Sequence, residues 1–213
     1  PIDKNTIQNK HFYFNGHTEY FTNLSNENNS LMLMVKDKLK VGIVTNHIPV
    51  NEVSKSLTSI QILKKIELMH QALVTDFNIK NPKIALLGLN PHSGDMGLIG
   101  REEIEIINPT IKKANQNNFN VFGPFPADGF FASGNYQSFD GILGMYHDQG
   151  LIPFKILSQN EGVNFTAGLS FIRTSPDHGT AYDIVGKNKA NIKSFKNAVK
   201  TAKEIYLNRK MIN

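Results

Sequence analysis

Three histidines occur in segments that are suited to binding a metal ion: His47 in the segment TNHIP, His92 in GLNPHSGD and His147 in MYHDQG. Each follows an apolar run with the composition of a strand or lies in a turn, and ligands in open α/β sheets bind beyond the carboxyl ends of strands. Neutral imidazoles are good ligands for zinc and related divalent ions, and three of them leave coordination positions open for a substrate. One such histidine alone is more often a hydrogen-bonded structural residue. The context shared by all three predicts that they meet around one divalent metal ion at a substrate site.

A second group of side chains is suited to binding an anion such as phosphate. It consists of His17 and Thr18 in the segment GHTE, together with Lys155, Asn164 and Arg173. Arginine offers a planar fork and lysine a point charge to phosphate, while threonine and asparagine add neutral hydrogen bonds. The alternative is that these cations simply face water, as most Lys and Arg side chains do.

A third candidate is the segment 174–187, which contains several small residues and leads toward a predicted helix. Small residues allow close approach to the backbone, and a helix N-terminus favours phosphate, so the segment suits a nucleotide-binding loop. It lacks the Gly-x-Gly-x-x-Gly pattern. An ordinary glycine-containing loop is an equally good interpretation of this segment alone.

Short apolar runs alternate with helical patterns along the chain, and these elements must position the three groups. The predicted strands are 31–35, 41–45, 83–88, 120–122, 141–145 and 152–157. Several of these runs are apolar without alternation, which suits strands covered on both faces. Apolar residues three or four positions apart predict helices over 53–73, from 102 onward with an end or kink at Pro109, and from about 191. The last helix is predicted to have an apolar face made of Ile192, Phe195, Val199, Ala202 and Tyr206. The fold class is therefore α/β.

Composition excludes several classes of protein. The chain has no cysteine, so metal ligands must come from histidine, carboxylate or carbonyl groups. No apolar run is long enough to cross a membrane and no basic-then-apolar leader opens the sequence, so we expect a soluble, cytoplasmic protein. The formal net charge is +5, but the lysines near the C-terminus fall at helical spacing without interleaved stacking aromatics. We expect a solvated helix face there and no nucleic-acid partner.

Five motifs occur in the order typical of one enzyme family: GHTE at 16–19, GLNPH at 88–92, GPFPAD at 123–128, YHDQG at 146–150 and RTSPDHGTA at 173–181. The intervals between the three histidines agree as well. On these motifs the chain resembles the 4-hydroxythreonine-4-phosphate dehydrogenases, NAD-dependent enzymes of pyridoxine phosphate synthesis, over essentially all of its length. It departs from some relatives in the loop after the NPH motif, where they carry a second histidine and this chain has Leu98, so Leu98 is given no metal role.

The resemblance implies a layered αβα, two-lobe fold like that of isocitrate and isopropylmalate dehydrogenases. Residues 1–150 would form the lobe that binds metal and substrate and contacts a second subunit, and residues 151–213 the C-terminal part of a cofactor lobe. Family members have a long N-terminal segment that is missing here and that helps to build the cofactor lobe. We therefore expect this lobe to be incomplete and the isolated chain to have weak or no dehydrogenase activity.

The resemblance also implies roles for individual residues. His47, His92 and His147 would bind Zn²⁺, Mg²⁺ or Co²⁺ across the interface of a homodimer. The phosphorylated substrate would be contacted by His17, Thr18, Lys155, Asn164 and Arg173. By similarity to the adenosine-binding loop of isocitrate dehydrogenases, NAD or NADP would be contacted by Asp177, His178, Gly179, Thr180 and Ala181.

The implied reaction is oxidation of the substrate's 3-hydroxyl group by hydride transfer to NAD, followed by decarboxylation, which converts 4-phosphooxy-L-threonine to 3-amino-2-oxopropyl phosphate. A metal ion would supply Lewis-acid stabilisation in both steps. Asp128, Asp148 and Lys155 are the candidates for accepting the hydroxyl proton, although Asp148 is favoured for orienting a histidine ligand. Two alternatives stay open: a family member that acts on threonate or erythronate 4-phosphate, and a non-catalytic metal-binding or anion-binding domain on the same scaffold.

Overall fold

The computed structural model describes the chain except for residues 1–5, 8, 10–13, 15, 26–28 and 213. Its helices are α1 (His17–Leu24), α2 (Val50–Ser56), α3 (Ser59–Gln71), α4 (Asn108–Gln116), α5 (Ala127–Ala132), α6 (His147–Ser158) and α7 (Lys193–Ile212). Its strands are β1 (Leu31–Lys36), β2 (Leu39–Ile43), β3 (Lys83–Leu87), β4 (Asn120–Phe125), β5 (Gly141–Gly144), β6 (Val163–Ala167) and β7 (Thr174–Pro176). Shorter helical turns lie at Ala72–Asp76, Pro91–Gly97, Glu103–Ile107, Asn135–Ser138 and Tyr182–Ile184.

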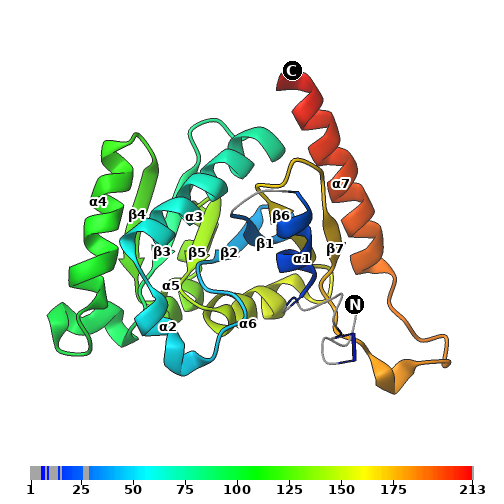
Figure 1. Cartoon of the computed structure of the whole chain (residues 1–213), viewed down its shortest axis with the longest axis horizontal. Helices are drawn as coiled ribbons and strands as arrows, with labels where there is room; N and C mark the ends of the chain where they lie inside the picture. Colours follow the sequence, from blue (N-terminus) through cyan, green and yellow to red (C-terminus); the bar gives the residue numbers. More distant parts are fainter. Residues whose placement is uncertain (1–5, 8, 10–13, 15, 26–28, 213) are drawn as a thin grey trace.

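The strands form one mixed sheet in the order β4-β3-β5-β2-β1-β6-β7, which runs through the middle of the molecule (Figure 1). Neighbouring strands from β4 to β2 are parallel. A tight hairpin then reverses the chain, so β1 is antiparallel to both β2 and β6, and β7 is antiparallel to β6. The sheet therefore changes from parallel to antiparallel at β2.

Helices cover both faces of the sheet, as the nearly continuous apolar strands predict. Leu31, Leu33 and Val35 of β1 belong to a core on one face that also contains buried residues of α3, α4 and α7. Met32 and Met34, the alternate residues of the same strand, face a second core that contains residues of α5 and α6. The predicted layered αβα architecture is confirmed. Residue 150, the predicted lobe boundary, lies inside α6, and the division into two lobes stays a prediction.

The segment 152–157 was wrongly predicted as a strand, because it lies within α6. Leu151 and Phe154 are buried against the sheet, whereas Ile152 is 56% exposed and Ile156 69% exposed. Burial thus follows the three-residue spacing of a helix and not the alternation of a strand. The sequence prediction also missed β6 and β7 and joined α2 and α3 into one helix.

The prediction placed the start of α7 within two residues of the observed one but chose the wrong face. The residues that pack inward are Ser194, Ala198, Thr201 and Ile205, while Phe195, Val199 and Tyr206 are at least half exposed. The hydroxyl group of Ser194 donates to the carbonyl oxygen of Gly162 at 2.6 Å and accepts from the backbone N–H of Asp177 at 3.0 Å. Small and polar inward residues let the helix axis lie close to the sheet edge, and the hydrogen bonds fix its rotation.

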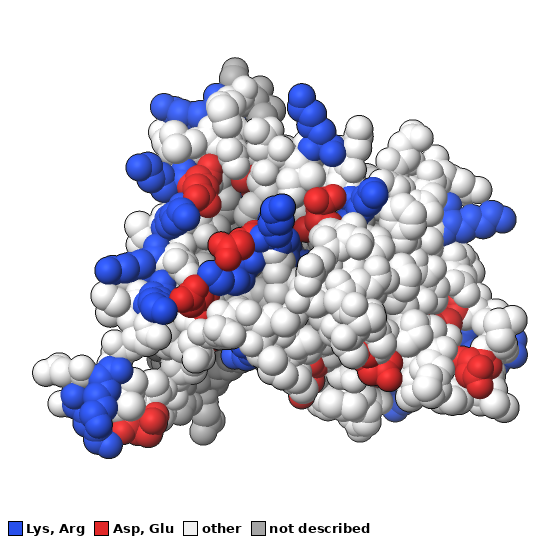
Figure 2. Space-filling view, turned by 180° about the vertical axis from the view of Figure 1, so that it is seen from behind, with Lys and Arg blue, Asp and Glu red and all other residues white. Residues whose placement is uncertain are grey.

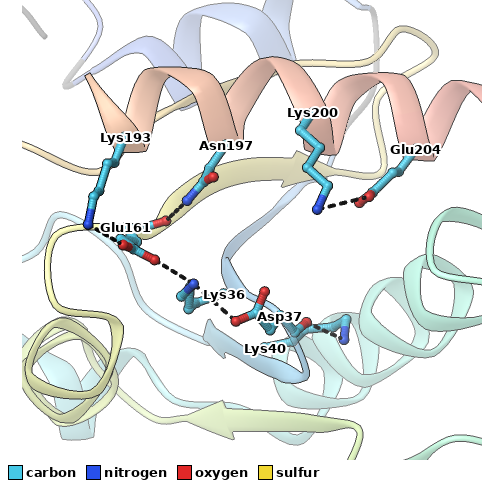
Figure 3. Close-up of polar contacts among 8 residues, drawn as sticks. All are labelled: Lys36, Asp37, Lys40, Glu161, Lys193, Asn197, Lys200 and Glu204. Atoms are coloured by element: carbon cyan, nitrogen blue, oxygen red, sulfur yellow. Dashed lines mark hydrogen bonds and ion pairs between the residues drawn. The ribbon is translucent and has the colours of Figure 1, made fainter.

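Ion pairs hold the start of α7 against the sheet (Figure 3). The carboxylate of Glu161 lies 2.7 Å from Lys36 Nζ of β1 and 3.0 Å from Lys193 Nζ of α7. Asn197 donates to the backbone carbonyl oxygen of Glu161 at 2.9 Å. Figure 2 shows acidic and basic side chains interspersed on the face seen from behind. The excess positive charge therefore forms no continuous positively charged patch on that face.

Candidate functional site

The three histidines follow three neighbouring parallel strands. His92 comes after β3, His147 after β5 and His47 after β2, and β5 pairs with both other strands. Backbone hydrogen bonds continue the β2–β5 pairing beyond the strands, from Thr45 N–H to the Met145 carbonyl oxygen at 3.1 Å. All three histidines therefore leave the sheet at the same edge, which is the edge where α/β folds bind ligands.

His47 and His147 lie together. Their ring centroids are 5.9 Å apart, and each ring faces a carboxylate with its Nδ1 atom. His47 Nδ1 lies 3.1 Å from Glu19 Oε1, and His147 Nδ1 lies 2.7 Å from Asp148 Oδ1. A carboxylate on Nδ1 fixes the tautomer and presents Nε2 to a metal, as in many carboxylate–histidine–metal arrangements. The chemistry of this donor set fits a divalent ion.

His92 does not join this pair within one chain. Among the residues that the structure describes, no group of three or more His, Cys, Asp or Glu side chains is placed to hold a metal ion. His92 instead lines a hollow of about 530 Å³ that Asp128 and Asp148 also line. Its backbone opens a run of six residues, through Gly97, that all have positive φ.

The carboxylate of Glu103 holds the segment that carries His92. Glu103 is 2% exposed, and its Oε1 accepts from the backbone N–H groups of Leu89 at 2.7 Å and Asn90 at 2.8 Å. Its Oε2 accepts from Asn90 Nδ2 at 2.9 Å. Glu103 could not be recognised from the sequence, since nothing local distinguishes it from an exposed helix residue.

The predicted anion-binding residues separate into two places. Arg173 Nη1 donates to Thr166 Oγ1 at 3.1 Å and to Asn164 Oδ1 at 3.4 Å. The Arg173 guanidinium also lies 5.8 Å from the ring centroid of Phe21 in α1, the helix that begins with His17 and Thr18. Burial lowers the pKa of Arg173, but a guanidinium stays protonated in proteins. These residues form a partly buried cationic cluster, and Glu19, whose Oε1 lies 3.1 Å from His47 Nδ1, acts electrostatically on its Arg173.

Lys155 is held elsewhere. Its Nζ lies 3.4 Å from Asp177 Oδ1, and Asp177 directly follows β7. Arg173 directly precedes β7, so Lys155 and Arg173 are held at opposite ends of this strand. Burial raises the pKa of Asp177, and the nearby Lys155 opposes that effect. Asp177, a predicted cofactor contact, thus faces Lys155. The next residues of the predicted cofactor loop, His178 to Thr180, are exposed.

Two further polar residues lie beside the histidines and were missed. Gln149 accepts from Met145 N–H at 2.7 Å and donates to the Gly88 carbonyl oxygen at 2.6 Å, so it joins the ends of β5 and β3. The side-chain oxygen of Asn46 is buried without a hydrogen-bond partner within the described part of the chain. An acceptor of this kind next to His47 is suited to a donor group on a ligand. Both residues are close in sequence to the motif histidines His47 and His147, and this proximity was the only feature of the sequence that could have indicated them.

Among the described helices, none combines the length and the apolar character needed to cross a membrane.

Comparison with known proteins gives consistent matches over nearly the whole chain. Residues 1–202 match the family model described as "Pyridoxal phosphate biosynthetic protein PdxA". A 4-hydroxythreonine-4-phosphate dehydrogenase of Bacteroides thetaiotaomicron is 52% identical over 98% of this chain and 58% of its own length. One from Vibrio vulnificus is 45% identical over 96% of this chain and 63% of its own length.

A solved structure gives the same result. The crystal structure of 4-hydroxythreonine-4-phosphate dehydrogenase from Klebsiella pneumoniae superposes with a TM-score of 0.79 at 37% identity, covering 98% of this chain and 61% of that one. The predicted isocitrate dehydrogenase-like α/β fold is thereby confirmed. The chain spans about three fifths of the length of the relatives it matches. The family model and the relatives agree, and the chain belongs to the PdxA family of pyridoxal phosphate biosynthetic proteins.

Proposed function

We propose that this chain forms the metal-binding and substrate-binding part of an NAD-dependent 4-hydroxythreonine-4-phosphate dehydrogenase. The whole protein would oxidise and decarboxylate 4-phosphooxy-L-threonine to 3-amino-2-oxopropyl phosphate in cytoplasmic pyridoxine 5'-phosphate synthesis. Family membership and the names of the relatives support this assignment. Because the chain covers about three fifths of these relatives, turnover is proposed for the whole protein.

The observation that carries the proposal is the pair of His47 and His147. Their ring centroids are 5.9 Å apart, and the Nδ1 atom of each ring contacts a carboxylate. Zn²⁺, Co²⁺ or Mg²⁺ bound there would supply a Lewis acid for both the oxidation and the decarboxylation. In this scheme Asp148 orients His147. Asp128, in the adjoining hollow, is then the better placed carboxylate to accept the hydroxyl proton.

The cationic cluster would hold the phosphate group. Arg173 and Asn164 already contact one another, and α1 brings His17 and Thr18 to the same side through the contact of Phe21 with Arg173. Fixing the phosphate would place the substrate's reacting carbon at the nicotinamide. Lys155 would reach the phosphate after release from Asp177, and the loop from Asp177 to Ala181 would contact the adenosine part of NAD.

His92 would come from a second copy of the chain. No three His, Cys, Asp or Glu side chains of one chain come together to hold a metal ion among the described residues, and His92 lines the hollow that adjoins His147. This supports a centre shared between the subunits of a homodimer. Each dimer would then contain two identical centres, each made from two histidines of one copy and one of the other.

Metal titration of the protein tests the centre. Calorimetric titration with Co²⁺ should give one ion per chain, and His47→Ala and His147→Ala should each weaken binding at least about 100-fold. The control is His70→Gln, since His70 packs against Phe119 and belongs to none of these motifs. Unchanged affinity in the His47→Ala and His147→Ala variants would refute the proposed centre.

Mixing two inactive variants tests the shared arrangement. Dimers formed from one His47→Ala chain and one His92→Ala chain contain one intact centre if His92 is contributed by the second copy. They contain none if all three ligands belong to one chain. Mixed dimers that bind about half as much metal as wild-type dimers would support the shared centre, and mixed dimers that bind none would contradict it.

Turnover tests the substrate. The complete protein should produce NADH from 4-phosphooxy-L-threonine, and Arg173→Ala should raise KM more than it lowers kcat, because the phosphate is held in both ground and transition states. Threonate and erythronate 4-phosphates are the comparison substrates. Faster turnover of either would assign the protein to the alternative substrate class, and turnover of none would leave only a binding function.

A further inference from the structure

Glu19 connects two parts of the site that are far apart in sequence. It lies in the first turn of α1, and its Oε1 is 3.1 Å from Nδ1 of His47, 28 residues further along the chain. The side chain of Glu19 is 30% exposed and that of His47 is 24% exposed. This carboxylate is therefore held in a partly buried position where it meets the ring from the side opposite Nε2.

The helix that carries this carboxylate lies close to two partly buried cations. Its Phe21 ring centroid is 5.8 Å from the Arg173 guanidinium, and its Thr22 hydrogen-bonds to Ser30, the residue that Lys65 contacts. Burial lowers the pKa of Arg173 and of Lys65, and the charge of Glu19 raises both. Lys65 comes from α3 and donates a hydrogen bond to the backbone carbonyl oxygen of Ser30. Glu19 thus lies near one histidine and two cations that come from three separate segments of the chain.

We infer that Glu19 is a positioning residue with two effects of opposite sign: it orients His47 for a metal ion and offsets the positive charge that Arg173 and Lys65 present to an anion. This inference rests on the proposed function, because it assigns His47 to a metal and Arg173 to a phosphate. Glu19 need not touch the substrate itself.

The two effects predict opposite changes in affinity. Glu19→Ala removes the acceptor of the His47 Nδ1 proton and should weaken Co²⁺ binding about 10- to 100-fold. Glu19→Gln keeps an oxygen that can accept this hydrogen bond but removes the charge, so its loss of Co²⁺ affinity should be smaller. Both variants should bind inorganic phosphate about threefold to tenfold more tightly, because less negative charge faces the anion. A variant that merely unfolds would bind both ligands more weakly.

The experiment titrates the protein separately with Co²⁺ and, in the presence of a chelator, with inorganic phosphate. The matched control is Glu67→Gln, which removes the same charge from an exposed pair with Lys64 on α3 and should change neither affinity. Long-range ¹H–¹⁵N spectra of the metal-free protein at pH 8 provide a readout independent of metal binding. The wild-type His47 ring should carry its proton on Nδ1, and Glu19→Ala should shift it toward Nε2.

Weaker Co²⁺ binding together with tighter phosphate binding would support the inference. Unchanged Co²⁺ affinity in Glu19→Ala, weaker phosphate binding in both variants, or an unchanged His47 tautomer would overturn it. If wild-type protein binds no Co²⁺, the proposed metal function fails. The tautomer measurement would then still decide whether Glu19 orients His47.

Discussion

Glu103→Gln should loosen the segment that carries His92. The Glu103 carboxylate accepts three hydrogen bonds, from Leu89 N–H, Asn90 N–H and Asn90 Nδ2. Hydrogen bonds to a charged group contribute about 1.5–3 kcal/mol each and neutral ones about 0.5–1.5 kcal/mol, so loss of the charge costs about 1 kcal/mol per bond. The new amide also turns a donor toward either Asn90 Nδ2 or the backbone. We therefore expect a total loss of about 3 kcal/mol in the free energy of unfolding.

Urea unfolding measures this loss, and hydrogen exchange shows where it acts. Amide protons between residues 89 and 100 should exchange faster in the variant, while those of β1 should change only by the global loss of stability. Glu105→Gln is the control, because Glu105 is exposed and pairs with Arg101 on the helix surface, where such pairs contribute less than about 0.5 kcal/mol. A Glu103→Gln variant as stable as Glu105→Gln would show that the buried carboxylate does not hold this segment.

Two further predictions concern the frame of the site. Burial lowers the pKa of Lys40 below its usual value of 10.5. Between the lowered pKa and 10.5 the folded chain therefore binds fewer protons than the unfolded chain, and the free energy of unfolding rises with pH. In urea unfolding at a series of pH values, Lys40→Met should flatten this rise and exposed Lys38→Met should not, and equal slopes in both variants would contradict the assignment. Gly150→Ala should lower the free energy of unfolding by about 1–3 kcal/mol, because the new Cβ would lie 2.9 Å from a methyl group of buried Ile43. The control Gly129→Ala in α5 has nothing within 4 Å of the new Cβ and should be neutral or stabilising by up to about 1 kcal/mol. A loss of stability in both variants would point to another cause.

Local sequence was sufficient to find the parallel half of the sheet and the edge where the histidines stand. The runs that became β1 to β5 are apolar and short, and turns follow them directly, which are properties of neighbouring residues. The strand β6 was not found because Asn164 interrupts a short run, and its place in the sheet depends on pairing with β1 across more than 100 residues of chain. The helix α6 was mistaken for a strand because its exposed Ile152 and Ile156 hide the apolar spacing.

The site was predictable in its motifs and not in its contacts. The type and order of the histidines indicated a metal, but the pairing of His47 with Glu19 depends on where α1 lies relative to the loop after β2. Likewise Lys155 and Arg173 were grouped by chemistry, although β7 keeps their anchors apart. Such distances are set by tertiary packing, which one sequence does not contain.

The turn from His92 to Met96 has a consequence for substitution tolerance. All five residues have φ between 42° and 80°, a region that β-branched side chains strongly disfavour and that Gly, Asn and Asp adopt more readily. In a saturation-mutagenesis library, Val, Ile and Thr should therefore be depleted at Ser93, Asp95 and Met96 even in a selection for folding alone. Depletion of these residues at the three positions in a selection for activity would therefore reflect the left-handed backbone conformation. Only depletion at His92 would reflect its proposed role in metal binding.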